Sequence, residues 1–205
     1  MTFRPVALAA TLALTIAACG NSSSSSDATA NPLDTTTEFV VNPIEWKACD
    51  GSTSTEVECG NIEVPFDYTD PEQGSFVLYV KKHNASNPAS RIGSMMVNPG
   101  GPGFGGSSLA DDAQYYFSQD LIDNFDIIAW DPRGTGESTP AINCVDTYDE
   151  YFGLDSPPET PEEKQALIDA SQAFNDKCAE NSGTILPYIS TKASAQDITS
   201  LRLAL

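Results

Sequence analysis

The chain has 205 residues, of which 40% are hydrophobic, and its formal net charge is −19 at pH 7. That hydrophobic fraction is enough to build a core, which excludes a fully disordered chain. So acidic a protein is repelled by phosphate backbones, and nucleic acid is therefore not expected as a partner. We attribute the acidity to solubility.

The first 18 residues have the pattern of an export leader. Arg4 provides a short positive region, and residues 6–18 are apolar apart from two threonines. This run is too short to span a bilayer comfortably. Ile16-Ala17-Ala18-Cys19 resembles a bacterial lipobox, in which the cysteine becomes lipidated and N-terminal. We predict a lipoprotein signal peptide at 1–18 and lipidation at Cys19, with an ordinary cleaved signal peptide as the alternative.

Residues 19–43 are predicted to form a Ser/Thr-rich tether. The stretch is polar, with an unbroken serine run at 22–26, and Leu33 is the only large apolar residue of its central part. Such composition gives a flexible linker that cannot build a core. We expect it to hold a folded domain, residues 44–205, at the outer face of a bacterial cell membrane, or to precede that domain in a secreted protein.

Besides Cys19 the chain has four cysteines, at Cys49, Cys59, Cys144 and Cys178. An even number in an exported chain indicates two disulfides, and the sequence alone allows three ways of pairing them. There is no Cys-x-x-Cys and no His/Cys cluster. We therefore expect no zinc or other metal site, and no cofactor.

The first half of the domain is predicted to be rich in strands. Residues 57–64 and 75–83 read as an antiparallel hairpin whose turn lies at 70–74, and 94–97 as a further strand. Residues 108–111 have capping-box spacing and begin a helix that runs to about Phe117. Residues 125–130 form a largely apolar strand, as expected when both faces are covered.

Two helices are predicted in the second half. Thr160-Pro161-Glu162-Glu163 is a strong helix start, Gly183 is a natural end, and Leu167, Phe174 and Cys178 share one face. The last helix begins near Lys192, with Ile198, Leu201 and Leu205 spaced for one buried stripe.

The most informative stretch is a glycine loop that follows the strand at 94–97. It reads Asn98-Pro99-Gly100-Gly101-Pro102-Gly103-Phe104-Gly105-Gly106, with five glycines and two prolines. Glycine permits positive φ and a close approach of bare backbone, while proline stiffens the loop. This is the residue chemistry of an oxyanion hole or a phosphate cradle.

A second motif follows the strand at 125–130 and reads Asp131-Pro132-Arg133-Gly134-Thr135-Gly136-Glu137-Ser138. Taken together in this order, the two motifs resemble the α/β-hydrolase exopeptidases, in particular the proline iminopeptidases and the secreted tripeptidyl aminopeptidases. Residues 46–49 and 58–68 resemble the lead-in of the secreted group. The resemblance covers roughly residues 44–205.

The resemblance implies an α/β-hydrolase fold whose mixed sheet begins with antiparallel strands and continues with parallel ones. It implies a serine hydrolase that acts on peptides with a free N-terminus. The family's glycine loop maps onto residues 99–103, so the Gly101 N–H is the expected oxyanion donor; Pro99 stands where the iminopeptidases have histidine. The resemblance, like the local spacing, favours the disulfides Cys49–Cys59 and Cys144–Cys178.

The motif at 131–138 is expected to be architectural, with Asp131, Arg133, Gly134, Gly136 and Ser138 forming a structural turn. Arg133 is predicted to make a charge-assisted bond that fixes this turn beneath the glycine loop. The alternative is a solvated turn, since Asp-Pro and Gly-Thr-Gly are ordinary turn formers.

The catalytic triad of such a hydrolase is not found in the sequence. The expected chain order is serine, acid, histidine, with the serine in Gly-x-Ser-x-Gly, and no such pentapeptide occurs. The single histidine, His83, precedes every plausible nucleophile, and we expect it at the surface beside Lys81 and Lys82. We therefore interpret the chain as the N-terminal part of a longer enzyme that ends before the strand bearing the nucleophile, and we expect it to be inactive alone.

Parts of the sequence also fit other interpretations. Ser108 comes near the elbow pattern, but the preceding loop makes a helix cap the better reading. Gly101 to Gly106 also matches Gly-x-Gly-x-x-Gly, with Asp126 placed like a ribose-binding acid, although Pro102 removes one N–H from that cradle. A non-enzymatic alternative is an exported binding lipoprotein or a pseudoenzyme.

Overall fold

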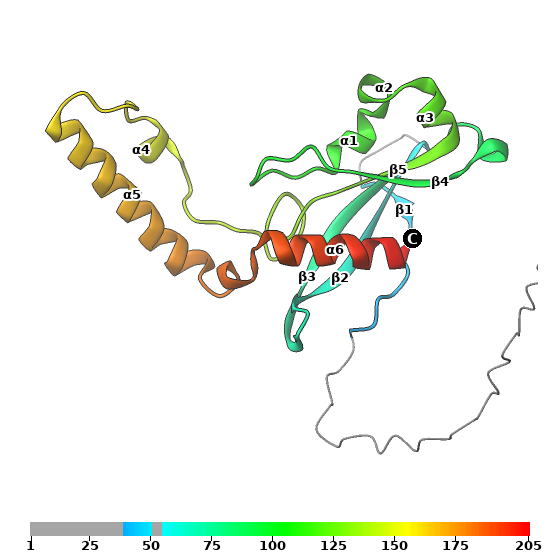
Figure 1. Ribbon diagram of the computed structural model, residues 1–205, viewed down its shortest axis with the longest axis horizontal. Coiled ribbons are helices and arrows are strands. Elements are labelled where there is room, and N and C mark those ends of the chain that lie inside the picture. The colour runs from blue at the N-terminus through cyan, green and yellow to red at the C-terminus, as the bar shows by residue number, and fades with distance from the viewer. Residues whose placement is uncertain (1–38, 51–54) are drawn as a thin grey trace, which may run out of the picture. The chain divides into compact units, whose positions relative to one another are not determined.

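The computed structural model describes residues 39–50 and 55–205. The predicted leader, Cys19 and most of the tether lie outside these ranges. The described part contains one mixed sheet and several helices (Figure 1). Its strands are β1 Lys47–Ala48, β2 Val57–Asp67, β3 Asp70–His83, β4 Gly93–Val97 and β5 Phe125–Trp130. Its helices are α1 Ser108–Asp111, α2 Ala113–Tyr116, α3 Gln119–Asn124, α4 Asp149–Phe152, α5 Pro161–Ser182 and α6 Thr191–Ala204, with 3-10 turns at Pro88–Ser90 and Leu186–Tyr188.

The strand order across the sheet is β1-β2-β3-β5-β4. Pairing is antiparallel from β1 to β5, whereas β4 lies parallel to β5. A parallel pair needs a crossover connection, and the segment carrying α1, α2 and α3 provides it. The mixed sheet agrees with the predicted α/β class. Within the described ranges, β4 is an edge strand whose outer side pairs with no other strand.

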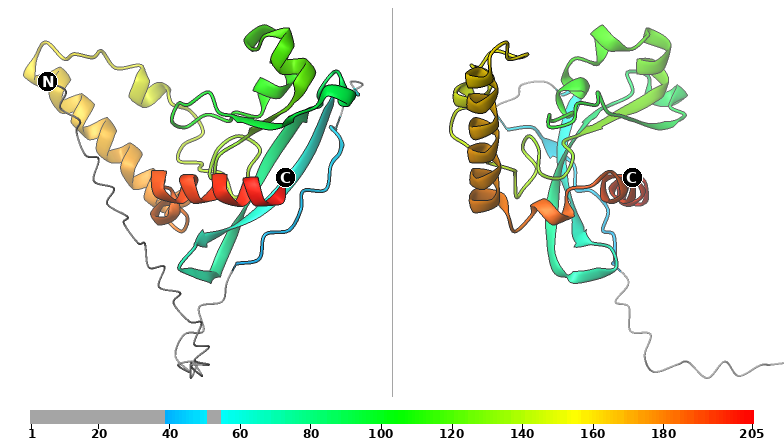
Figure 2. Two further views of the ribbon diagram at one scale, coloured as in Figure 1. Left: turned by 45° about the vertical axis from the view of Figure 1, so that its right-hand side comes forward. Right: turned by 60° about the vertical axis from the view of Figure 1, so that its left-hand side comes forward.

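Two cores lie on opposite faces of the sheet. Leu78 and Ile128 belong to one buried cluster together with Leu201 of α6. Ala129 belongs to a second cluster that includes Ala110 of α1. Successive strand residues point to opposite faces, so the neighbours Ile128 and Ala129 contribute to different cores. Hence α6 covers one face and α1 the other (Figure 1 and Figure 2).

The predicted hairpin of β2 and β3 is confirmed, but its turn was placed wrongly. Residues 70–74 belong to β3, and the chain reverses at Tyr68 and Thr69. The Asp67 carboxylate accepts hydrogen bonds from Thr69 N at 2.8 Å and Thr69 Oγ1 at 2.7 Å. Hydrogen bonds of this kind, from a residue to the side chain of an aspartate two positions earlier, close a tight turn.

The helix predicted from Ser108 to Phe117 is broken after Asp111, and its expected capping box is absent. The residue before the helix is Ser107, and no side chain caps this end. The Asp111 carboxylate binds Lys81 Nζ of β3 at 2.6 Å, and so does not return to the helix start. The short helix α3 was not predicted, because its six residues show too little periodicity.

The start of α5 was predicted correctly. Glu163 N donates to Thr160 Oγ1 at 3.2 Å, and Thr160 N donates to Glu163 Oε2 at 3.0 Å, which completes a capping box. Gly183 follows the last helical residue. The predicted face, which includes Phe174, is partly buried. No helix in the described ranges, α5 included, is long and apolar enough to cross a membrane.

The last helix, α6, begins where predicted but buries a different face. Leu201 is fully buried, whereas Ile198 and Leu205 are 39% and 45% exposed. The polar residues Asp197 and Ser200 take their place on the buried face. A search for apolar periodicity misses such a face, because its polar members are stabilised by partners elsewhere in the chain.

Two disulfides are present, and their pairing is the one that the resemblance implied. Cys49–Cys59 joins the end of β1 to β2, with the Cα atoms 5.0 Å apart. Cys144–Cys178 joins the segment after β5 to α5, with the Cα atoms 4.1 Å apart. Asn181 Nδ2 also donates to Cys144 O at 2.8 Å, so the second disulfide lies in a hydrogen-bonded junction.

Candidate functional site

The glycine loop, residues 98–106, connects β4 to α1. Val97 at the end of β4 lies opposite Ala129, two residues before Asp131. Parallel strands have their carboxyl ends at the same edge of a sheet, so the glycine loop and the turn at 131–138 are neighbours there (Figure 1). This edge is where open α/β sheets bind ligands.

The exposed part of the glycine loop has a backbone that suits glycine. The φ angle is +82° at Gly100, +150° at Gly101 and +95° at Gly103, values that residues with a side chain rarely adopt. Asn98 Oδ1 accepts a hydrogen bond from Gly100 N at 2.7 Å. The N–H groups of Gly101 and Gly103 have no acceptor among the described residues. The loop therefore presents free backbone donors.

The end of the loop next to α1 is packed too tightly for side chains. A Cβ on Gly105 would lie 2.6 Å from Asp131 Oδ1. A Cβ on Gly106 would lie 2.7 Å from Trp130 O and 2.9 Å from Pro99 Cδ. The Pro99 ring thus lies against Gly106 and brings the two ends of the loop together. The free N–H groups of the loop thus lie beside a tightly packed segment formed by Pro99, Gly105 and Gly106.

Asp131 connects the glycine loop with the turn. Its side chain is buried, at 2% exposure. Oδ1 accepts from Ser107 N at 2.8 Å, and Oδ2 accepts from Glu137 N at 2.9 Å. None of the ion pairs in the described ranges involves this carboxylate. A buried charge needs hydrogen bonds, and these two backbone donors come from different segments. Asp131 therefore sets the distance between loop and turn.

The turn is also tied to β3. Asp131 N donates to Tyr79 O at 2.9 Å, and Tyr79 N donates to Ser138 Oγ at 2.9 Å. Ser138 Oγ in turn donates to Asp131 O at 2.6 Å. Gly134 and Gly136 both have positive φ, and a Cβ on Gly136 would lie 2.3 Å from Asp131 Oδ2. Of the residues predicted as a structural turn, Gly136 and Ser138 thus lie against Asp131, whereas a Cβ on Gly134 would meet Ile142 and Ile189.

Arg133 makes a charge-assisted bond, as predicted, and it is 1% exposed, which contradicts the alternative of a solvated turn. Its partners, however, do not belong to the glycine loop. Its Nε and Nη2 donate to the two carboxylate oxygens of Asp197 at 2.8 and 2.6 Å. The remaining N–H groups donate to Phe66 O, Tyr188 O and Pro65 O at 3.0, 3.0 and 3.2 Å. All five guanidinium donors are used. Arg133 therefore ties the turn to α6 and to the end of β2.

The acid proposed for a dinucleotide site is engaged in the fold. Asp126 is the second residue of β5 and is 8% exposed. Its Oδ1 accepts from Ala85 N at 2.9 Å, and its Oδ2 accepts from Arg91 Nε at 2.7 Å. Both oxygens hold the segment before β4, and neither is free for a ribose.

His83 is not the surface residue that the sequence suggested. It is 7% exposed, lies at the end of β3 opposite Ile127, and its Nδ1 has no hydrogen-bond partner among the described residues. The end of β3 runs toward the start of β5, whereas the glycine loop lies at the other end. A histidine that follows two lysines is not recognisable as buried until the strand pairing is known.

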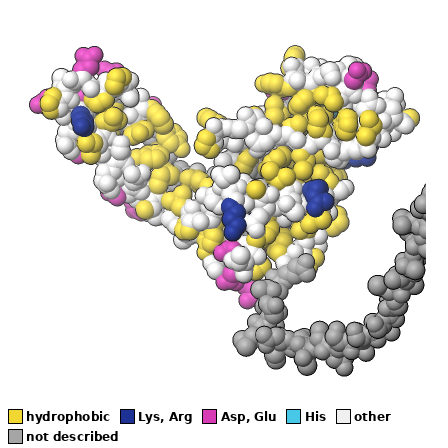
Figure 3. Space-filling model, viewed as in Figure 1, with side chains coloured by type: hydrophobic (Ala, Val, Ile, Leu, Met, Phe, Trp, Pro, Cys, Tyr) yellow, Lys and Arg dark blue, Asp and Glu magenta, His cyan; other side chains and the backbone are white. Residues whose placement is uncertain are grey.

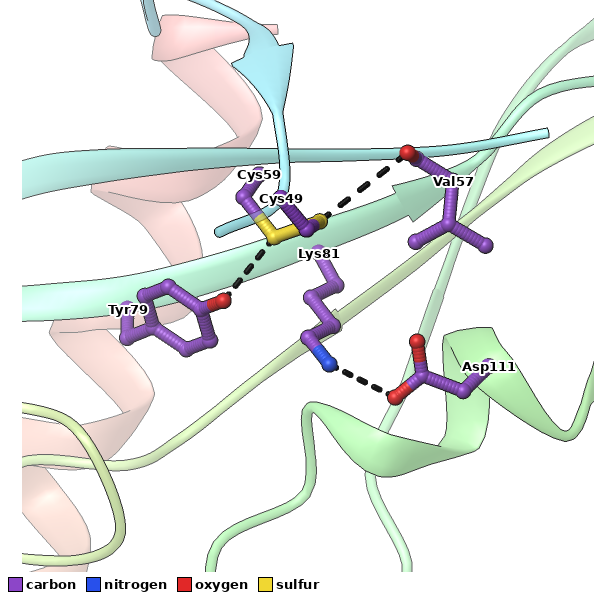
Figure 4. The surroundings of a disulfide bond; sticks show 6 residues. All are labelled: Cys49, Val57, Cys59, Tyr79, Lys81 and Asp111. Atoms are coloured by element: carbon purple, nitrogen blue, oxygen red, sulfur yellow. Dashed lines mark hydrogen bonds and ion pairs between the residues drawn. A yellow bond between two sulfur atoms is a disulfide. The ribbon is translucent and has the colours of Figure 1, made fainter. Parts of the chain in front are cut away.

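The Cys49–Cys59 disulfide lies on the same face of the sheet as α1 (Figure 4). The Tyr79 hydroxyl donates to Cys59 Sγ at 2.9 Å. Burial raises the pKa of this hydroxyl, so it remains a neutral donor at ordinary pH. Two residues along β3, Lys81 forms the ion pair with Asp111 of α1. Sequence reasoning missed these supports of α1, although the i, i+2 spacing of Tyr79 and Lys81 on one strand was available.

Other features of the described part are separate from this edge. A hollow of about 480 Å³ beside α4 and α5 includes Tyr151 and Phe174, whose rings stack at 5.7 Å. Its lining includes no residue of the glycine loop or of the turn at 131–138. Within 39–50 and 55–205 no three His, Cys, Asp or Glu side chains gather as metal ligands would.

Comparison with known proteins shows to which family the chain belongs. No family model matches the chain. It is 32% identical over 171 residues to a tripeptidyl aminopeptidase of Streptomyces coelicolor, covering 79% of this chain and 31% of that protein. It is 29% identical over 173 residues to the serine protease Hip1 of Mycobacterium tuberculosis, covering 80% and 32%. It is 30% identical over 169 residues to a carboxylesterase B of the same species, covering 78% and 32%.

The chain belongs to the α/β-hydrolase superfamily. The resemblance drawn from the glycine loop and the motif at 131–138 is thereby confirmed. This α/β-hydrolase chain spans about a third of the length of the curated relatives it matches. The names of these relatives indicate serine hydrolases and peptidases.

Proposed function

We propose that this chain supplies the oxyanion-hole part of a serine hydrolase that cleaves peptides from their free N-terminus. The observation that carries the proposal is the Gly101 N–H, free of any described acceptor and held on a base anchored to Asp131. In acyl transfer the carbonyl oxygen gains negative charge, and one preorganised donor is worth about 2.7–4 kcal/mol. Gly101 is the proposed donor.

The triad is proposed to lie outside these 205 residues. The sequence has no Gly-x-Ser-x-Gly, and its one histidine, His83, is buried away from the glycine loop. The outer side of β4 has no partner in the described part. A further parallel strand on that side would end at the same edge, and a serine after it would lie beside Gly101. The N–H following that serine would be the second donor.

The substrate class is proposed from the relatives. A tripeptidyl aminopeptidase among them supports peptides with a free N-terminus, and a carboxylesterase supports acyl transfer as the shared reaction. This chemistry requires no cofactor. We assign no residue of this chain to the binding of the substrate amine.

We further propose that the protein is exported and anchored by a lipid on Cys19 to the outer face of a bacterial membrane. The pattern at 16–19 supports the anchor. Two disulfides support an oxidising compartment, since such bonds are rare in the cytosol.

The proposal is tested by removing the Gly101 N–H alone. Proline cannot be used, because it requires φ near −65° and Gly101 has +150°. In the full-length protein, glycolic acid in place of Gly101 converts the amide to an ester and adds no side chain. We expect kcat to fall by about 10²–10³ with little change in KM. The same exchange at Gly103 is the control and should leave kcat near wild type; the reverse result contradicts the assignment.

A second measurement concerns the chain by itself. Residues 19–205 alone are expected to aggregate through the open edge of β4 and to hydrolyse neither peptides nor esters. The full-length protein is expected to be active and to be blocked by a serine-directed phosphonate. Activity of residues 19–205 that resists this inhibitor would contradict the proposal. A stable, inactive product that binds peptides would favour the binding-lipoprotein alternative.

A further inference from the structure

Phe104 is an aromatic side chain inside the glycine loop. It is 73% exposed. Its neighbours Gly103, Gly105 and Gly106 are glycines, so no adjacent side chain covers the ring. A Cβ on Gly101 would lie 3.5 Å from both Cδ2 and N of Phe104. The ring therefore borders the side of Gly101 on which a side chain would stand, and Gly101 carries the proposed oxyanion donor.

A solitary exposed aromatic residue is not remarkable by itself, because much protein surface is apolar. Figure 3 shows hydrophobic side chains at several places on one face of the molecule. Tyr115 and Tyr116 of α2 are 78% and 65% exposed. Among the large exposed hydrophobic residues of the described ranges, however, Phe104 is the one that belongs to the glycine loop. Its position next to Gly101, the proposed oxyanion donor, distinguishes it from the other exposed residues.

The backbone on both sides of Phe104 is held in place. Gly105, the next residue, lies against the Asp131 carboxylate, and Ser107 N is bonded to the same group at 2.8 Å. On the other side, Asn98 Oδ1 fixes Gly100 N. An apolar group of a ligand can therefore cover the exposed ring, and the backbone that carries the ring loses little conformational entropy when the ligand binds.

We propose that Phe104 is a specificity-determining residue that packs against an apolar group bonded to the scissile carbonyl. The inference rests on the proposed function. A carbonyl oxygen that accepts from Gly101 N lies about 3 Å from that nitrogen. The substituents of its carbonyl carbon then come within reach of the ring. The favoured substrates are peptides in which the residue contributing the scissile carbonyl has a large apolar side chain.

The kinetic test uses the full-length protein and paired tripeptide p-nitroanilides that differ at this residue, Ala-Ala-Leu and Ala-Ala-Ser. We expect Phe104→Ala to lower the Leu/Ser ratio of kcat/KM by about tenfold, the effect of losing a hydrophobic contact of modest size. Phe104→Leu should restore part of the ratio. Tyr116→Ala changes an exposed aromatic residue outside the loop; it is the matched control and should leave the ratio unchanged. An unchanged ratio in Phe104→Ala overturns the inference.

A binding measurement separates this inference from the proposed function. In Phe104→Trp, the emission of the new tryptophan is obtained by subtracting the wild-type spectrum from that of the variant. We expect the wavelength of this emission to shift on addition of the peptide Ala-Ala-Leu, and not on addition of Ala-Ala-Ser. Tyr116→Trp should show no shift. A shift without hydrolysis in the wild type means that the proposed function fails while the ring still contacts apolar ligands. Hydrolysis with neither a shift nor a changed ratio means that the function stands and the role of Phe104 is refuted. Absence of both refutes both.

Discussion

The buried pair of Arg133 and Asp197 provides the sharpest test of how the turn is held. The side chains are 0% and 2% exposed, and Nη2 lies 2.6 Å from Oδ1. Asp197 is the only charged acceptor of the guanidinium, since its other three acceptors are backbone carbonyls. Asp197→Asn keeps the size of the side chain and removes its charge, which leaves the Arg133 cation buried without a counterion.

Leaving one charge of a buried pair uncompensated costs about 3–5 kcal/mol. We expect that loss of unfolding free energy for Asp197→Asn. Arg133→Met should cost more than Asp197→Asn, because it strands the Asp197 carboxylate and also removes the donor to the carbonyls of Pro65, Phe66 and Tyr188. The double variant removes both charges, and its loss should fall short of the sum of the singles by about 2 kcal/mol.

The assay is urea unfolding of the full-length protein, followed by tryptophan fluorescence for the wild type, both single variants and the double variant. Lys177→Met is the control, because the Lys177–Glu180 pair is 57% and 65% exposed and should contribute nothing measurable. A loss for Asp197→Asn no larger than that of Lys177→Met would refute the reasoning. So would strict additivity of the two single variants.

Three further predictions follow from the contacts around the site and from the leader. Gly105→Ala adds a Cβ 2.6 Å from Asp131 Oδ1 and should lower kcat of the full-length enzyme by displacing the loop, whereas Gly93→Ala, with nothing within 4 Å, should not; equal activities would argue against a tightly packed loop base. Burial, and next the charge of Asp197, raise the pKa of Tyr68, so above about pH 10 the folded state keeps a proton that the unfolded chain loses. The free energy of unfolding should therefore decline above about pH 10. Tyr68→Phe should flatten that decline in urea titrations from about pH 8 to 11. Cys19→Ser should abolish lipid labelling and release the protein from the membrane fraction, and unchanged retention would count against the anchor.

Local features of this chain were readable from the sequence. The capping box of Thr160 and Glu163 depends on residues three positions apart, and it is present as predicted. The apolar run at 125–130 forms β5 with the predicted bounds. The glycine loop was located because glycine and proline act through their own backbone. The family followed from two short motifs in a fixed order.

Features that depend on distant partners were missed or misplaced. One local feature was misplaced as well: the hairpin turn was predicted at 70–74, whereas the Asp67 side chain accepts from Thr69 and closes it earlier. His83 was expected at the surface, and strand pairing buries it. The capping box at Ser108 is absent because Asp111 binds Lys81 of β3, 30 residues away.

By itself, the sequence determined where the glycine loop lies, which residues form β5 and α5, and that the chain is related to α/β hydrolases. Only the tertiary structure decided that Asp131 joins the loop to the turn and that Arg133 reaches Asp197, 64 residues away in α6. The physical reason is one of range. Helix caps, turns and strand periodicity depend on atoms within a few positions of the chain. A buried charge is stable only beside a partner, and the fold brings that partner from a distant segment.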